Sequence, residues 1–177
     1  MPIDEALITR IRDIKLAIFD VDGVLTDGSL YYGPSGEESK VFNTHDGHGL
    51  KMLRESGVEL AIISGRQSKA LERRAKDLHI AQLFMGVENK RNMFEKILKS
   101  RSLTPAQSAG LGDDLIDLPF LTRCGFAACV PSAPQYVKQH VHYVTTARGG
   151  NGAAREFCDL IMQTQGTWDA AMKKYLD

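Results

Sequence analysis

The stretch from Lys15 to Asp27 constrains the fold of this chain more than any other. It opens with the apolar run Leu16–Phe19, which is typical of a strand buried on both faces. Two acids, Asp20 and Asp22, follow at the carboxyl end of that strand, and Gly23 lets the backbone turn at once. Residues two apart in an extended chain point to the same side. The sequence therefore directs both carboxylates into one small volume.

Two carboxylates held this close repel each other. Two unit charges about 4 Å apart interact by roughly 4 kcal/mol at an effective dielectric constant of about 20. A bound cation is the simplest way to offset that repulsion. The alternative is a polar turn at the end of a strand, without any ligand. The stretch alone leaves both interpretations open.

Composition excludes several classes of protein. The 177 residues fit one domain, residues 1–177, and are enough to bury a hydrophobic core. The 22 Lys and Arg residues balance the 22 Asp and Glu residues, so we expect neither nucleic acid nor an anionic membrane as a partner. No apolar run approaches the ~18 residues of a membrane span, and we see no secretory signal. The 3 cysteines lack Cys-x-x-Cys spacing, which favours reduced thiols in a cytoplasmic protein.

Apolar periodicity divides the chain into alternating strands and helices. Residues 1–14 predict a short amphipathic helix, and residues 29–42 predict a β-hairpin. We expect a glycine-rich loop at 45–49, a flexible loop at 148–152 and a polar tail around Trp168. Further strands are expected at 58–63, 83–85, 108–111, 126–130 and 143–144, and helices at 50–56, 68–78, 90–100, 134–139 and 153–165. This alternation predicts an α/β fold, a Rossmann-like doubly wound parallel sheet with helices on both faces.

Polar side chains also follow the later strands. Ser64 comes after the strand at 58–63, and Lys90 lies on the loop after the next strand. The acids after the strand at 108–111 are Asp113, Asp114 and Asp117. Each residue taken alone has a structural explanation, such as a helix cap or a solvated charge. Ligands of such sheets bind outside the carboxyl ends of the strands, so their joint occurrence there predicts a shared site.

Four short motifs occur in a fixed order. The chain reads Asp-x-Asp-Gly-Val-x-Thr-Asp from Asp20, Ile-Ser-Gly-Arg around Ser64, Asn-Lys at Lys90, and Gly-Asp-Asp-x-x-Asp up to Asp117. This series, within residues 18–117, resembles the motifs of the haloacid dehalogenase-like phosphatases. Larger members of that superfamily insert a cap domain between motifs. Here the gap between the first and second motifs holds only a hairpin and a helix, and the gap between the third and fourth motifs holds only a helix and a strand. The resemblance therefore implies a fold without a cap domain.

The resemblance implies a role for each motif residue. Asp20 would be the nucleophile, and Asp22 the general acid and base. Ser64 and Lys90 would bind the phosphoryl group. The implied cofactor is Mg²⁺, with ligands from Asp20, the backbone carbonyl of Asp22, and Asp113. The implied supporting residues are Asp114 and Asp117, and the implied substrate-binding residues are Thr26, Asp46, Gly65 and Arg66.

Physical chemistry agrees with these roles. A carboxylate nucleophile divides phosphoester hydrolysis into formation and breakdown of an aspartyl-phosphate. A second carboxyl group can first protonate the leaving alcohol and then activate water. Phosphoryl transfer mainly needs charge stabilisation on the equatorial oxygens. Mg²⁺ prefers carboxylates and water, which matches a site of oxygen ligands only.

Segments outside the motifs narrow the resemblance from the superfamily to one family within it. The hairpin, residues 42–49 and residues 148–156 resemble the 3-deoxy-D-manno-octulosonate 8-phosphate phosphatase family. That resemblance implies a sugar-acid phosphate substrate, a role in lipopolysaccharide synthesis, and a homotetramer in which a neighbouring subunit closes each active site. Members often carry Arg and Tyr where this chain has His45 and His48, for which we expect a place at the substrate rim or a structural role. The hairpin residues that fit burial between subunits are Leu30, Tyr31, Tyr32, Val41 and Phe42.

Other functions remain as alternatives. A related nine-carbon keto-sugar phosphate or a phosphoprotein could be the substrate of the same chemistry. A receiver-like signalling module is also doubly wound and carries an acidic pocket. Its phosphoacceptor Asp should end a mid-chain strand, where this chain has Ser64. The sequence therefore favours the enzyme.

Overall fold

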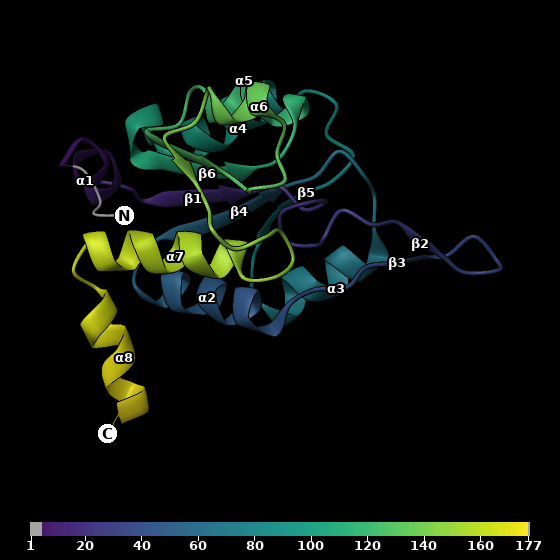
Figure 1. Cartoon of the computed structure of the whole chain (residues 1–177), viewed down its shortest axis with the longest axis horizontal. Helices are drawn as coiled ribbons and strands as arrows, with labels where there is room; N and C mark the ends of the chain where they lie inside the picture. Colours follow the sequence, from purple (N-terminus) through teal and green to yellow (C-terminus); the bar gives the residue numbers. More distant parts are fainter. Residues whose placement is uncertain (1–4, 177) are drawn as a thin grey trace.

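The computed structural model describes residues 5–176, in which six strands form one parallel sheet (Figure 1). The strand order is β5-β4-β1-β6-β7-β8, and β1 is buried throughout. The strands are β1 (Leu16–Phe19), β4 (Glu59–Ile63), β5 (Gln82–Phe84), β6 (Ser108–Gly112), β7 (Phe126–Cys129) and β8 (Tyr143–Val144). The predicted doubly wound α/β fold is confirmed.

Helices cover both faces of the sheet, as Figure 1 shows. On one face lie α2 (Thr44–Glu55), α3 (Lys69–Asp77) and α7 (Ala153–Thr164), and on the other α4 (Lys90–Arg101), α5 (Leu118–Leu121) and α6 (Gln135–Lys138). Two short 3-10 helices are η1 (Pro105–Gln107) and η2 (Leu115–Asp117). The helix predicted at 1–14 is α1 (Glu5–Arg12), and residues 1–4 of that prediction lie outside the described residues.

Aromatic rings join the sheet to the helices of one face. The ring of Phe157 on α7 is 5.6 Å from that of Phe19 and stacks at 5.2 Å on that of Phe126. All three side chains are fully buried, and burial of each contributes about 1.5–3 kcal/mol. The cysteines Cys124, Cys129 and Cys158 are also buried with free thiols. The core thus fixes the central strands, whose ends carry the polar motifs.

The register of the sheet aligns those strand ends. Phe19 pairs with Ile62 of β4 and with Leu111 of β6. The backbone N–H of Asp20 donates to the carbonyl of Leu111 at 3.0 Å, which continues the ladder one step further. Residues that follow these three strands therefore emerge at the same level of the sheet.

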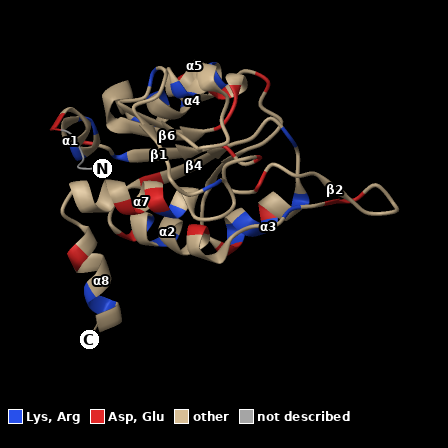
Figure 2. Ribbon diagram, in the orientation of Figure 1, with Lys and Arg blue, Asp and Glu red and all other residues tan. Residues whose placement is uncertain are grey.

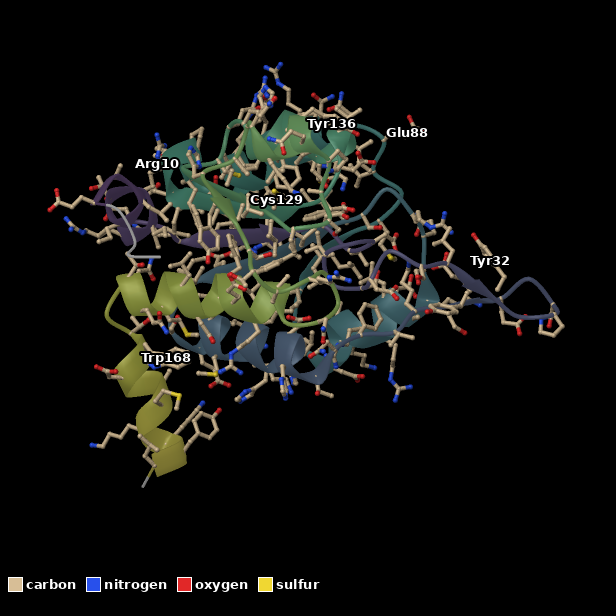
Figure 3. The ribbon with its side chains drawn as sticks, in the orientation of Figure 1. Arg10, Tyr32, Glu88, Cys129, Tyr136 and Trp168 are labelled. Carbon is tan, nitrogen blue, oxygen red and sulfur yellow. The ribbon has the colours of Figure 1, made fainter. Side chains whose placement is uncertain are left out.

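A β-hairpin leaves the body between β1 and α2 (Figure 1). Its antiparallel strands, β2 (Tyr31–Tyr32) and β3 (Glu38–Ser39), have two residues each. Figure 3 labels Tyr32 on this projection, and its side chain is 60% exposed. The predicted hairpin is confirmed.

The glycine-rich loop predicted at 45–49 is wrong, because α2 already begins at Thr44. The side chain of Asn43 caps this helix by accepting from the backbone N–H groups of His45 at 2.7 Å and Asp46 at 3.3 Å. A Cβ atom on Gly49 would lie 3.0 Å from the Cα atom of Arg155. This glycine therefore allows α2 and α7 to approach closely and does not mark a loop.

The polar tail predicted around Trp168 is also wrong, since residues 168–176 form helix α8 (Trp168–Leu176). Trp168, Ala171 and Met172 lie on one face of this helix and pack against the core. The guanidinium of Arg155 lies 5.9 Å from the centre of the Trp168 ring, and Figure 3 labels Trp168 near the start of α8.

Charge is distributed evenly over the surface. Figure 2 shows Lys and Arg interspersed with Asp and Glu on the helices. Within residues 5–176, no helix has the length and apolar character needed to cross a membrane.

Candidate active site

Three strand ends and one helix start meet at the carboxyl edge of the sheet. Asp20 follows β1, Ser64 follows β4, and Asp113 follows β6. Lys90 is the first residue of α4, whose N-cap Asn89 accepts from the backbone N–H of Asn92 at 2.9 Å. The fold therefore gathers polar residues that the sequence separates by up to about a hundred positions.

Lys90 connects the nucleophile candidate to the acidic loop after β6. Its Nζ atom lies 2.5 Å from Oδ1 of Asp20 and 2.6 Å from Oδ1 of Asp117. Lys90 is 3% exposed and Asp117 is fully buried. Burial opposes the charge on the lysine, but the two carboxylates outweigh it and raise the pKa of Lys90 above its usual value. Lys90 is therefore a fixed cation in the site.

Asp117 also orders the loop that carries Asp113. Its Oδ2 atom accepts from the backbone N–H of Asp113 at 2.9 Å and from that of Asp114 at 3.3 Å. With Lys90 on the other oxygen, each carboxylate oxygen of Asp117 has a partner. The Asp114 carboxylate caps η2 by accepting from the backbone N–H of Leu115.

Three carboxylates form a cluster that favours a cation. Asp20, Asp113 and Asp117 each offer an oxygen, and these atoms lie within 4.8 Å of one another. Burial, followed by the charge of Asp20, raises the pKa of Asp113 to about 8. Burial and the charge of Asp117 also raise the pKa of Asp20, in spite of Lys90. Oxygen-only ligands in a site of excess negative charge fit Mg²⁺.

Gly23 leaves the space that Asp113 occupies. Its backbone has a φ of +91°, and a Cβ atom there would lie 2.1 Å from Oδ2 of Asp113. Any other residue would therefore strain the turn and collide with a carboxylate of the acidic cluster.

Thr26 holds the loop after β1 in shape. Its buried hydroxyl oxygen accepts from the backbone N–H of Gly28 at 3.2 Å and from that of Gly23 at 3.4 Å. These contacts are internal to the loop, and the substrate-binding role predicted for Thr26 stays a prediction.

The loop at 148–152, predicted as flexible, packs on the loop after β1. The backbone N–H of Gly150 donates to the carbonyl of Val24 at 2.9 Å. A Cβ atom on Gly149 would lie only 1.7 Å from the carbonyl oxygen of Gly23. Beside this contact is a cavity of about 390 Å³ lined by Asp27, Pro131, Ser132, Arg148 and Gly149. Glycine here serves close backbone approach, and the predicted flexibility of the loop stays a prediction.

Asp46 lies on α2 and points to the start of α7. Its carboxylate accepts from the backbone N–H groups of Arg155 at 2.8 Å and Gly152 at 3.2 Å. Burial raises its pKa, although these hydrogen bonds favour the charged form. This gives Asp46 a structural use, and its predicted substrate-binding role stays a prediction.

His45 and His48 are also on α2. His45 is exposed. The Nε2 atom of His48 lies 2.8 Å from the hydroxyl of Tyr175, and the two rings meet edge to face. His48 thus connects α2 to α8, which supports the structural alternative for this residue.

Ser64 and Arg66 face the site from the end of β4. Ser64 is 1% exposed, and its hydroxyl oxygen accepts from the backbone N–H of Arg66 at 3.2 Å across Gly65. The Arg66 guanidinium donates to Glu38 at 2.5 Å and to the Tyr32 hydroxyl at 2.9 Å. The structure thus connects Arg66 to the hairpin, a contact that the sequence does not reveal.

Sequence reasoning missed Lys40. Its Nζ atom forms an ion pair with Oδ1 of Asp22 and lies 3.1 Å from Oε1 of Glu38. Arg66 approaches the other oxygen of Asp22, at 3.9 Å from its Nε atom. Lys40 follows the second hairpin strand, and no motif or spacing signals its contact with a residue 18 positions earlier.

Comparisons with known proteins agree with this geometry. A family model described as haloacid dehalogenase-like hydrolase matches residues 82–157. The 3-deoxy-D-manno-octulosonate 8-phosphate phosphatase of Yersinia pestis is 42% identical over 170 residues, 96% of this chain and 91% of that protein. The corresponding Haemophilus influenzae phosphatase is 44% identical over 157 residues, 89% of this chain and 87% of that protein.

Solved structures extend the likeness to the whole fold. A probable YrbI family phosphatase from Pseudomonas syringae has a TM-score of 0.96 and 52% identity, covering 98% of this chain and 99% of its own. A second structure is the 3-deoxy-D-manno-octulosonate 8-phosphate phosphatase of Moraxella catarrhalis, in complex with magnesium, phosphate and a KDO molecule. It has a TM-score of 0.94 and 38% identity, and the match covers 96% of this chain and 97% of the Moraxella chain. The chain belongs to the 3-deoxy-D-manno-octulosonate 8-phosphate phosphatase family, within the haloacid dehalogenase-like hydrolases.

Proposed function

We propose that this protein hydrolyses 3-deoxy-D-manno-octulosonate 8-phosphate to the free sugar acid and phosphate, in a Mg²⁺-dependent reaction. The observation that carries the proposal is the buried contact of Lys90 with Asp20, next to the carboxylate of Asp113. This contact brings a nucleophile, a cation for the phosphoryl oxygens and metal ligands together at one edge of the sheet. The names of the relatives in Yersinia and Moraxella support the choice of substrate.

In the first half of the reaction, an oxygen of Asp20 attacks phosphorus and the bond from phosphorus to the sugar oxygen breaks. Asp22 gives its proton to that leaving oxygen. In the second half, the Asp22 carboxylate takes a proton from the water that attacks the aspartyl-phosphate, and Asp20 is released. Lys90 and the Ser64 hydroxyl donate to the phosphoryl oxygens throughout.

The remaining motif residues hold this arrangement. Asp20, Asp113 and the backbone carbonyl of Asp22 would bind Mg²⁺, which supplies charge stabilisation for the transferring group. Asp117 has partners for both oxygens, which suits support of Lys90 and the loop better than a place among the ligands. Asp114 supports the same loop through its cap on η2.

We infer that the sugar acid lies between Arg66 and the cavity beside Gly149. A guanidinium can bind a carboxylate or a phosphate through paired hydrogen bonds. Thr26, Asp46 and Gly65 complete the set of substrate-binding residues implied by the family resemblance. A product of this kind would enter lipopolysaccharide synthesis in the cytoplasm.

Phosphate release from a panel of sugar phosphates tests the activity. The panel holds the eight-carbon substrate, a nine-carbon keto-sugar phosphate and a phosphopeptide, each with Mg²⁺ and with a chelator. We expect the highest kcat/KM for the eight-carbon acid, no turnover with chelator, and none with the Asp20→Asn variant. A higher kcat/KM for another member of the panel would reassign the substrate, and turnover by Asp20→Asn would exclude Asp20 as nucleophile.

We also propose a homotetramer in which the hairpins meet and a neighbouring subunit closes each active site. The hairpin exposes apolar side chains that a lone subunit leaves in water, with Tyr32 60% and Val41 65% exposed. Light scattering should give a tetrameric mass for the natural chain and a smaller one for Tyr32→Glu. Leu176→Glu, at a more exposed site on α8, is the control and should keep the tetrameric mass. A monomeric mass for the natural chain would contradict the proposal.

A further inference from the structure

Each of the two acids after β1 has its own lysine. Lys90 contacts Asp20, whereas Lys40, from the far side of the hairpin, contacts Asp22. The Lys40 side chain is 1% exposed, so its charge is almost completely removed from water. A buried ammonium group is costly unless it is paired, and here both of its partners are carboxylates.

The contacts of Lys40 form a closed arrangement of charges. Glu38 lies between two cations, with Oε1 3.1 Å from Nζ of Lys40 and Oε2 2.5 Å from Nη2 of Arg66. Lys40 and Arg66 in turn face the two different oxygens of Asp22. In the carboxylate form that follows proton transfer, Asp22 is therefore held from both sides, and the two positive and two negative groups balance.

This arrangement leaves Asp22 with little freedom to rotate. A carboxyl group that serves as proton donor must meet the leaving oxygen at hydrogen-bond distance, and an error of about 1 Å can reduce the rate about 100-fold. Asp22 lies at the start of the turn after β1 and has a side chain 23% exposed, so the core does not fix it. The hairpin supplies the fixed contact that the core lacks.

We propose that Lys40 is a positioning residue, which holds the Asp22 carboxyl group at the leaving oxygen of the substrate. Glu38 holds Lys40 in turn. The hairpin then has a function in the active site of its own subunit, in addition to any contact between subunits. The proposal rests on the proposed function, because it assumes that Asp22 transfers a proton.

The dependence of the rate on the leaving group tests this proposal. A sugar phosphate has a poor leaving group that needs a proton, whereas 4-nitrophenyl phosphate releases a stable phenolate without one. Breakdown of the aspartyl-phosphate needs Asp22 with either substrate, so the rates to compare are those of the first half of the reaction, measured in single turnovers as release of the sugar or of 4-nitrophenolate. Misplacement of Asp22 should slow this half for the sugar phosphate only. We expect Lys40→Met to lower the single-turnover rate of sugar release about 10-fold to 100-fold and to leave that of 4-nitrophenolate release within about threefold. Lys40→Arg should recover most of the lost rate.

Three further variants separate the possible outcomes. Lys99→Met removes an exposed lysine on α4 and should leave the rates with both substrates unchanged. Glu38→Gln should lower the ratio of the rate with the sugar phosphate to the rate with 4-nitrophenyl phosphate. This variant tests the proposal if Lys40→Met does not fold. Asp22→Asn should lower that ratio most.

An equal loss of the single-turnover release rate for both substrates in Lys40→Met, or no loss, would overturn the positioning role. If Asp22→Asn lowers the rate ratio and Lys40→Met does not, only the role of Lys40 fails. If Asp22→Asn does not lower it either, the assignment of Asp22 in the proposed function fails as well.

Discussion

At the scale of single residues, the contact between Gly23 and Asp113 depends on the absence of one carbon atom. The turn at Gly23 puts its Cα beside Oδ2 of Asp113, where a Cβ would lie at 2.1 Å. The loops after β1 and β6 can therefore approach closely enough for Asp20 and Asp113 to share a cation. A glycine in a motif with two acids thus has a geometric function in the metal site.

Gly23→Ala should weaken Mg²⁺ binding and activity together. The added methyl group displaces Asp113, and the positive φ adds strain of about 1 kcal/mol. We expect Mg²⁺ affinity, measured by calorimetry, to fall at least about tenfold. Gly57→Ala is the matched control, because Gly57 has a φ of +102° and no neighbouring atom within 4 Å. Equal Mg²⁺ affinity in both variants would contradict the steric explanation.

The acids and the lysine at the strand ends could be predicted from sequence, since Asp20 and Asp113 follow apolar runs within one or two residues and Lys90 follows its strand after a short loop. Lys40 could not be predicted, because its contact with Asp22 depends on how the hairpin folds back over the site. The use of Asp46 as a cap on α7 likewise joins residues more than a hundred positions apart. Periodicity describes single elements, and it does not say which side chains meet across them.

At the scale of elements, α8 shows a second limit of sequence reasoning. The strands and most helices of the sheet were predicted within a few residues, because their apolar runs are buried. In the described chain, α8 has no fully buried residue and is attached by partial contacts. These include Trp168 under Arg155, the Tyr175 hydroxyl on His48, and an ion pair of Lys174 with Glu55. Such an element has a weak apolar signal.

Trp168→Ala should detach α8 without unfolding the sheet. The ring is the largest of the three α8 side chains that pack against the core, whereas exposed ion pairs contribute about 0–1 kcal/mol. We expect faster hydrogen exchange at residues 168–176 and unchanged exchange in β1 and β6. Lys174→Ala, which removes only the exposed ion pair with Glu55, should leave exchange in α8 nearly unchanged. Faster exchange throughout the sheet in Trp168→Ala would show that α8 is part of the cooperative core.

At the scale of the whole molecule, metal and stability are linked through the acidic cluster. The pKa of Asp113 is raised to about 8, and that of Asp20 is raised as well, from an ordinary value near about 4. Both groups therefore bind protons more tightly in the folded chain than in the unfolded one. Their contribution to stability is complete below about pH 4 and is lost as the pH rises to about 8.

The metal-free protein should therefore become less stable between pH 6 and pH 8. Each linked group lowers the free energy of unfolding by at most about 1.4 kcal/mol per pH unit. Mg²⁺ should reverse this trend, because it replaces the protons, and its apparent affinity should increase with pH over the same range. Urea unfolding at fixed protein concentration, with Mg²⁺ or with a chelator, measures both effects. Asp113→Asn should reduce the slope in chelator, because it removes the group with the higher of these pKa values. An unchanged slope in that variant, or a metal-free stability that does not vary between pH 6 and pH 8, would show that the cluster does not couple protons to folding.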